Sequence, residues 1–444
     1  MSNAHPKSSL LVIFAPLLSL VVYAIGHGLL GTLLTVRMSA EEVSPQWIGF
    51  ISSAYFAGLI AGTFVNTRII LRVGHIRAYA VYASILASVA LVFGLVVRPE
   101  IWLVLRLVGG FATGGLFVVI ESWLMVSTTT NQRGRVMGLY MVLFYASMAT
   151  GQLLLKSVDI MLLVPFTLAA LASSLSIIPL ALTKTKSPQF EDHGRLSLRK
   201  LVSITPAGVA SSFSAGLLLG VIYGLLPLFF FRVGLEVGAT ANMMAVVIIG
   251  GMCLQYPLGR ISDRFDRRLV LALLFSLILI LSCLCIWMNV TENQLLTAAF
   301  MFLFGGAMFS IYPISLSHAC DELPSGQTIN GNQGMLRSYS IGAMTGPIVA
   351  PQFISMAGPP GLFAYFIAVT SLVLAFLFWR RFVRKPVPLR DHSQFATAVP
   401  NTSLMSEYDP RSEHADTLDK MGSKQDGEPS NQDIADADSK SMNQ

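Results

Sequence analysis

Residues 259–268 read Gly-Arg-Ile-Ser-Asp-Arg-Phe-Asp-Arg-Arg, with six charged side chains in ten positions. This stretch stands between two apolar segments, 238–259 and 268–289, and each is long enough to cross about 30 Å of hydrocarbon as a helix. A short, mainly basic connection between two such segments is typical of a loop on the cytoplasmic side of a membrane. The stretch therefore indicates a chain that crosses a membrane repeatedly.

Outward from this loop, apolar segments of similar length recur along most of the chain. They lie near 10–34, 46–69, 78–97, 101–126, 136–155, 160–183, 204–231, 294–318, 333–355 and 361–382. The composition agrees, because 54% of the residues are hydrophobic and 12% are charged, whereas soluble domains carry about 25% charged residues. We predict an all-α polytopic membrane protein with twelve transmembrane helices.

The polar stretches divide these segments into six plus six. We predict a six-helix bundle over 1–183, a cytoplasmic linker over 184–203, a second six-helix bundle over 204–384, and a polar tail over 385–444. The tail is rich in Ser, Asp and Asn, a composition that favours disorder.

The basic residues predict the orientation. With the N-terminus inside, the cytoplasmic loops hold fourteen Lys and Arg and the external loops hold four, so both termini are expected in the cytoplasm. This distribution also explains the net charge of +6 without a nucleic acid partner. The loop 321–332 breaks the rule, since it carries Asp321 and Glu322 and no base, and we expect its charges to have a specific partner.

Catalytic and metal-binding patterns are missing from the sequence. The four cysteines form neither a CxxC pair nor a Cys/His ligand set, so no metal or cofactor is expected. Neither H-E-x-x-H nor G-x-S-x-G occurs. His27, Glu121 and His318 would be the only plausible catalytic set for an intramembrane enzyme, and we expect no enzyme.

The two halves of the chain look like copies of each other. Gly26-His27-Gly28 aligns with Ile222-Tyr223-Gly224, Gly109-Gly110 with Gly305-Gly306, and Gly151 with Gly346, all in the same order. Internal repeats of this kind are a signature of transporter folds.

The loop at 259–268 resembles the G-x-x-x-D-R-x-G-R-R motif of the major facilitator superfamily. The matching residues are Gly259, Asp263, Arg264, Arg267 and Arg268, while Asp266 replaces the second glycine. The first-half copy, 67–77, keeps Arg72 and Gly74 but has Leu71 at the aspartate position.

Other stretches extend the resemblance. Arg106 followed by Gly110 and Gly114 resembles a second motif of this superfamily. Within it, Glu121-Ser122-Trp123-Leu124 and Val73-Gly74-His75-Ile76-Arg77 resemble the YcaD-like bacterial permeases.

The resemblance implies a fold and a set of candidate residues. In the family, two pseudo-symmetric bundles alternate access to a central cavity lined by helices one, four, seven and ten. The candidate cavity residues are therefore Tyr23, His27, Arg106, Tyr223, Ser310 and Tyr312. The family fold also places Asp263 beside the N-terminus of helix five, where a carboxylate would latch the cytoplasmic side; the alternative is a solvated topology motif.

Three titratable or charged residues carry competing hypotheses. Arg106 either faces a cavity or partner, because an arginine in lipid is costly, or snorkels to the surface. Glu121, which aligns with Ser317 beside His318, either carries a coupling proton or holds Arg133, Arg135 or Arg337 at a gate. His27 is either a proton site or a helix-packing hydrogen-bond donor.

These expectations predict a monomeric secondary transporter of the bacterial inner membrane. It would move a small organic solute across the lipid bilayer with a proton as coupling ion. The open alternatives are a uniporter of the same fold and a transport-inactive sensor that acts through its tail.

Overall fold

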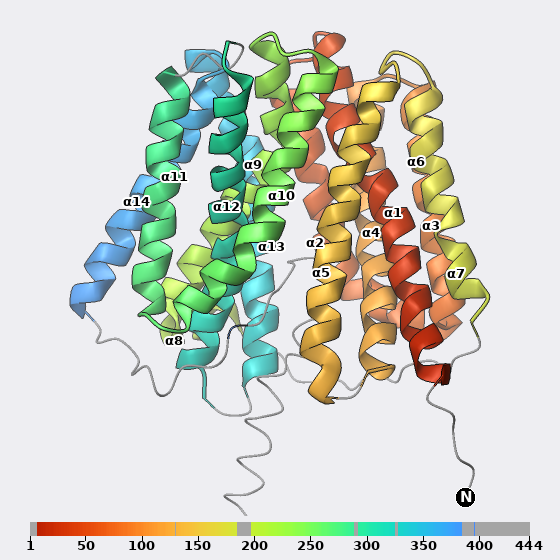
Figure 1. Cartoon of the computed structure of the whole chain (residues 1–444), viewed down its shortest axis with the longest axis horizontal. Coiled ribbons are helices and arrows are strands. Elements are labelled where there is room, and N and C mark those ends of the chain that lie inside the picture. The colour runs from red at the N-terminus through yellow and green to blue at the C-terminus, as the bar shows by residue number, and fades with distance from the viewer. Residues whose placement is uncertain are drawn as a thin grey trace, which may run out of the picture.

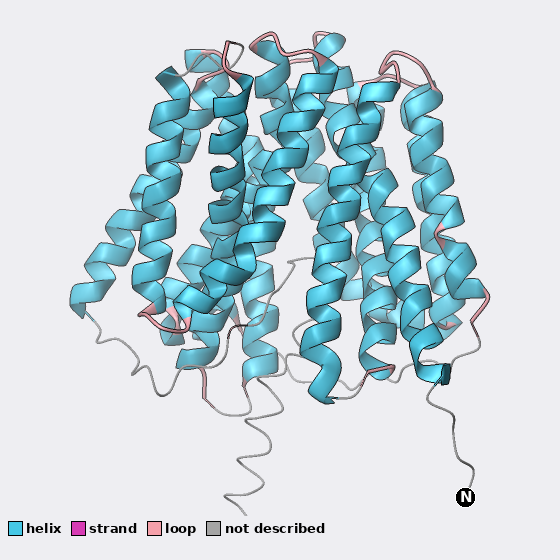
Figure 2. Ribbon diagram, viewed as in Figure 1, coloured by secondary structure: helices cyan, strands magenta, loops and turns pink. Residues whose placement is uncertain are grey.

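The computed structural model describes residues 7–128, 130–183, 197–287, 292–324, 327–383 and 395, and Figure 1 shows their arrangement. All regular structure in these residues is helical (Figure 2). The helices are α1 (Lys7–Ala40), α2 (Pro45–Val73), α3 (His75–Leu95), α4 (Pro99–Val126), α5 (Thr130–Leu154), the 3-10 turn η1 (Leu155–Ser157), α6 (Val164–Leu175), α7 (Ile177–Ala181), α8 (Leu198–Ile204), α9 (Pro206–Arg232), α10 (Val237–Ser262), α11 (Arg267–Trp287), α12 (Gln294–Glu322), α13 (Thr328–Ala357) and α14 (Gly361–Val383).

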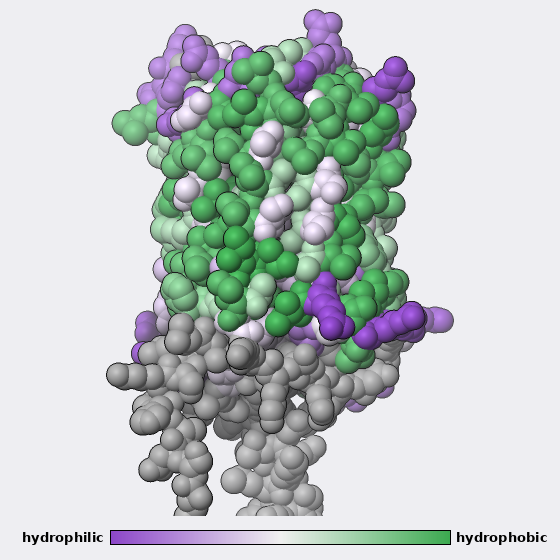
Figure 3. All heavy atoms as spheres, turned by 90° about the vertical axis from the view of Figure 1, so that its right-hand side faces the viewer, coloured by the Kyte–Doolittle hydropathy of each residue, from purple (hydrophilic) through white to green (hydrophobic). Residues whose placement is uncertain are grey.

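Eleven helices in the described residues are long and apolar enough to cross a membrane. Among the expected segments, the one at 333–355 falls short of that measure. It is helical as α13, thirty residues long, but its glycines, its prolines Pro347 and Pro351 and polar residues such as Thr345 and Gln352 keep its hydropathy low. Side chains on the face shown in Figure 3 form a broad apolar band with hydrophilic residues above it, as expected of a multi-pass membrane protein.

The sixth expected segment, 160–183, is broken in the structure into α6 and α7. The break falls at Ser176. Pro179 follows three residues later and has no amide hydrogen, so the helical hydrogen bond to Leu175 cannot form there. The linker positions 184–196 and the tail, apart from Phe395, lie outside the described residues.

Close glycine contacts occur in corresponding places of the two halves. Gly110 of α4 packs on the Tyr55 carbonyl of α2, and a side chain at Gly110 would overlap that oxygen. Gly305 of α12 packs in the same way on the Val247 carbonyl of α10. The packing of α2 on α4 is therefore equivalent to that of α10 on α12, one residue out of step with the sequence alignment, which pairs Gly110 with Gly306.

The helix group α1–α7 meets the group α9–α14 near one end of the molecule. We call the end with the turns at Gly74 and 263–266 the basic face, and the other end the far face. Toward the far face, Thr35 donates a hydrogen bond to the Gly224 carbonyl, and Ser53 donates one to the Met344 carbonyl. Gly49 lies directly against the Pro347 carbonyl. The two groups are thus closed against each other at the far face.

Candidate functional site

Side chains from three helices join in a polar cluster inside the first helix group. The Tyr23 hydroxyl lies 2.8 Å from Oγ1 of Thr113 and 3.3 Å from Nδ1 of His27. The Tyr55 hydroxyl lies 3.4 Å from Nε2 of His27. A neutral imidazole has one donor and one acceptor nitrogen, so His27 links the two tyrosines by accepting from one and donating to the other. The chain of hydroxyls and imidazole runs from α4 through α1 to α2.

Arg106 of α4 completes this cluster. Its guanidinium carbon lies 4.7 Å from the centre of the Tyr55 ring, a cation–π geometry. Its Nε is buried and has no hydrogen-bond partner within the described part of the chain. A desolvated cation–π contact contributes about 2 kcal/mol, whereas an arginine at the bilayer centre costs roughly 2.5 kcal/mol or more. The ring therefore offsets only part of the cost of placing this charge in the membrane.

A small cavity of about 30 Å³ opens beside the cluster, inside the helix group and bounded by α1, α2, α3, α4 and α6. Tyr23, His27, Tyr55, Arg106, Thr113 and Ser173 supply its polar wall. The remaining wall is apolar, and no aspartate or glutamate contributes to it. Of the expected cavity residues, the structure brings Tyr23, His27 and Arg106 together here, within one helix group.

Glu121 lies elsewhere on α4 and does not line this cavity. Its side chain is buried, and the Tyr140 hydroxyl of α5 donates a hydrogen bond of 2.8 Å to its Oε1. A buried carboxylate with a hydroxyl donor can exist with or without its proton, because either form can accept that hydrogen bond.

The expected residues of the second half do not line this cavity. The Tyr223 ring packs edge-on against Phe309 with centroids 5.8 Å apart. Ser310 is buried and donates to the Gly306 carbonyl of its own helix. Tyr312 packs against Tyr339 at 5.1 Å.

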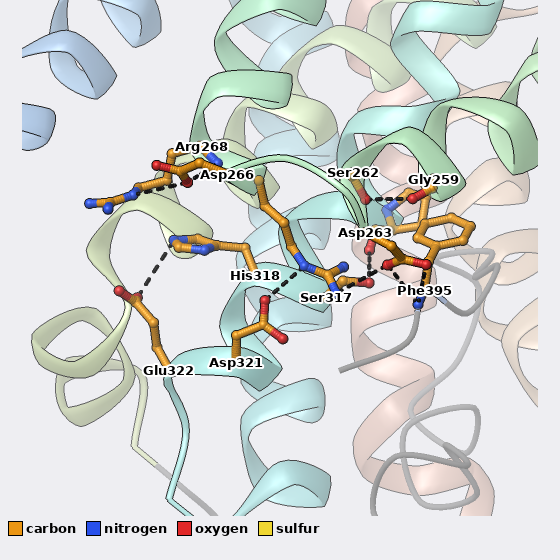
Figure 4. Close-up of polar contacts among 12 residues, drawn as sticks. Gly259, Ser262, Asp263, Asp266, Arg268, Ser317, His318, Asp321, Glu322 and Phe395 are labelled. Atoms are coloured by element: carbon orange, nitrogen blue, oxygen red, sulfur yellow. Dashed lines mark hydrogen bonds and ion pairs between the residues drawn. The ribbon is translucent and has the colours of Figure 1, made fainter. Parts of the chain in front are cut away.

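At the basic face, charged side chains form a cluster between α10, α11 and α12 (Figure 4). Arg267 is fully buried, and its Nε lies 2.7 Å from Oδ2 of Asp321. The Nε2 of His318 lies 3.6 Å from a carboxylate oxygen of Glu322. The loop that broke the charge rule therefore does have specific partners, as the sequence predicts for Asp321 and Glu322.

Asp263 ends α10 and has two partners in the described residues. It pairs with Arg267 at 3.3 Å, and it accepts hydrogen bonds from the Phe395 amide at 3.0 and 3.2 Å. The Phe395 ring packs on Gly259, where any side chain would overlap it (Figure 4). The expected partner, the N-terminus of α5, includes side chains that lie outside the described residues, at positions 129–131 and 133.

The other motif residues take less specific positions. Arg264 and Arg72 are exposed, and Arg268 pairs with Asp266 at 3.5 Å. Gly74 joins α2 to α3 with a φ of 86°, a backbone conformation that favours glycine. The first-half copy of the loop therefore retains its turn without the aspartate.

Sequence reasoning missed Tyr55, Thr113 and Tyr140. Thr113 stands seven residues after Arg106, which places both on one helix face, so this residue could have been found. The two tyrosines come from neighbouring helices whose rotation the sequence does not specify.

Comparison with known proteins identifies the family. The model of the Major Facilitator Superfamily matches residues 17–332. The chain belongs to this superfamily. It is 30% identical over 362 residues to the uncharacterized MFS-type transporter YcaD of Escherichia coli O17:K52:H18 (strain UMN026 / ExPEC), an alignment that covers 81% of this chain and 93% of the relative. Membership of a transporter family settles the enzyme alternative, and the chain is not an enzyme.

Solved structures share the fold. The nucleoside transporter NupG superposes with a TM-score of 0.67 at 16% identity, covering 84% of this chain and 100% of that one. A D-xylose-proton symporter superposes with a TM-score of 0.62 at 14% identity, covering 87% and 98%. At these identities the likeness concerns architecture alone.

Proposed function

We propose that this superfamily member is a proton-coupled secondary transporter that moves a small organic solute across the bacterial inner membrane by alternating access. The observation that carries the coupling is Glu121, a carboxylate 1% exposed within the membrane-spanning part of α4, with Tyr140 positioned to bond either of its protonation states. Ionisable groups inside membrane segments are costly and mark ion or substrate pathways.

The rocking units are proposed to be the bundles 1–183 and 204–384. Their contacts at the far face support a conformation closed on that side, with Thr35, Ser53 and Gly49 at the seam. The basic face would then be the cytoplasmic one, because it carries the arginine-rich loop at 259–268. We take the transporter to be a monomer.

Topology can be tested apart from transport. Reporter fusions at Gln444 and in the turn at Arg98 should report the cytoplasm and the periplasm, respectively. If both reporters respond from the same compartment, the orientation proposed here is wrong.

The transport proposal is tested with the full chain in proteoliposomes. Uptake of a solute library is measured with and without an imposed pH gradient. A solute that accumulates only with the gradient supports proton coupling. A solute that equilibrates equally in both conditions favours the uniporter alternative, and the absence of any flux together with a tail-binding partner favours the sensor.

A further inference from the structure

We propose that the cavity beside Arg106 binds one small, singly charged anion: a halide, or the carboxylate of an organic acid. The inference begins from charge. The wall contains a permanent cation in Arg106 and no acidic side chain. The charge is therefore not balanced by any wall residue, and a mobile counter-ion would balance it.

Hydrogen-bonding capacity points the same way. A guanidinium has five N–H donors and no acceptor. The buried Nε of Arg106 has no hydrogen-bond partner in the described chain. The nearby Tyr23 hydroxyl is already shared between Thr113 and His27. The cavity thus has an excess of donors, and an anion supplies acceptors with the missing charge.

The size and the walls of the cavity limit the ligand. A volume of about 30 Å³ has room for roughly two waters, and therefore for a halide or a carboxylate group. Leu30, Leu86, Val89 and Phe93 form an apolar wall beside the cation. One arginine balances one negative charge, so a phosphate dianion would remain uncompensated.

Binding is measured on the purified full chain in detergent. The probes are radiolabelled chloride and radiolabelled formate. The balancing anion is gluconate, which is too large for the cavity. We expect saturable binding of at least one probe. Arg106→Gln should weaken it roughly tenfold or more, because the charge-assisted donors are removed. The matched control is Arg98→Gln, an exposed arginine in the turn before α4, which should bind as the wild type does.

Competition then distinguishes the sources of the anion. Displacement of labelled formate by acetate more strongly than by chloride identifies the carboxylate of an organic acid. That result would name the substrate class of the proposed transporter, and this part alone rests on the proposed function. Displacement by chloride alone identifies an inorganic anion site.

A second variant guards against misfolding of Arg106→Gln. Thr113→Val keeps the side-chain shape at the cavity wall but removes a hydroxyl, and it should weaken binding by a smaller factor. The proposal is wrong if neither probe binds saturably, or if the wild type and Arg106→Gln bind equally. The cavity would then hold water rather than an anion. Since binding is measured without transport, its failure and the failure of solute uptake are separate results.

Discussion

The hydroxyl of Tyr140 on α5 donates a hydrogen bond of 2.8 Å to the buried carboxylate of Glu121 on α4. We expect Glu121→Gln to keep this contact, because an amide oxygen accepts the same hydrogen bond. The neutral side chain cannot exchange a proton, so accumulation driven by a pH gradient should be lost while exchange of solute across the membrane survives. Both are measured in proteoliposomes once a transported solute is known.

Tyr140→Phe is the matched control for that experiment. It removes the donor but leaves the carboxylate, so coupling should be weakened rather than abolished. If Glu121→Gln still concentrates solute in response to a pH gradient, Glu121 is not the proton site, and His27 becomes the candidate to test next.

Gly49 controls how closely the two helix groups approach at the far face. A methyl group there would overlap the Pro347 carbonyl, so Gly49→Ala should separate the groups and favour the conformation open at that face. Spin labels at Glu42 and Glu236, both exposed near that face, should report longer distances. Gly31→Ala is the control, because an added methyl group there meets no other atom, and its distances should match those of the wild type. If the distance distribution of Gly49→Ala is also unchanged, the contact at Gly49 does not hold the two helix groups together.

Arg267 and Asp321 form a buried ion pair. Removing one partner of such a pair costs about 3–5 kcal/mol, since the other charge stays buried. Arg267→Met should therefore lower the thermal unfolding temperature in detergent, and Arg267→Met combined with Asp321→Leu should recover part of the loss. Arg264→Met, at an exposed neighbouring arginine, is the control and should change stability by roughly 0.5 kcal/mol or less. A double variant no more stable than the single one would argue against the pairing.

Asp263 is proposed to latch the basic face when it meets α5. Asp263→Asn removes the charge that a helix N-terminus attracts, a contribution of about 1 kcal/mol, so the basic face should be open in a larger fraction of molecules. Spin labels at the exposed Arg135 and Phe265 would measure this. Asp266→Asn serves as the control. Identical distance distributions in Asp263→Asn and in the wild type would show that Asp263 does not hold the basic face closed.

The sequence predicts the membrane helices well because long apolar segments have few alternatives in a bilayer. It also predicts that the glycine pairs Gly109-Gly110 and Gly305-Gly306 correspond, but the alignment is one residue out of step, because the equivalent backbone contacts are those of Gly110 and Gly305. The break at Ser176 within the sixth segment was not anticipated, although Pro179 supplies its reason.

The polar clusters could be predicted only in part. Arg106, Tyr23 and His27 were grouped from the family resemblance, but that grouping implied a cavity between the bundles, whereas the structure places the three beside a cavity within one helix group. The sequence did not predict the roles of Tyr55, Tyr140 and the Arg267–Asp321 pair. Their contacts depend on the rotation of each helix and on which distant segments meet, and the periodicity of a single sequence does not specify either.

The polar character of α13 has a consequence for biogenesis. A helix this rich in polar residues is a poor substrate for the translocon by itself. Its polar groups find partners on earlier helices: Ser338 donates to the Val209 carbonyl of α9, and Asn332 accepts from the Cys320 thiol of α12. We therefore expect α13 to enter the bilayer only when α9 and α12 are already there. A chain split or permuted so that α13 is synthesised first should leave that helix outside the lipid.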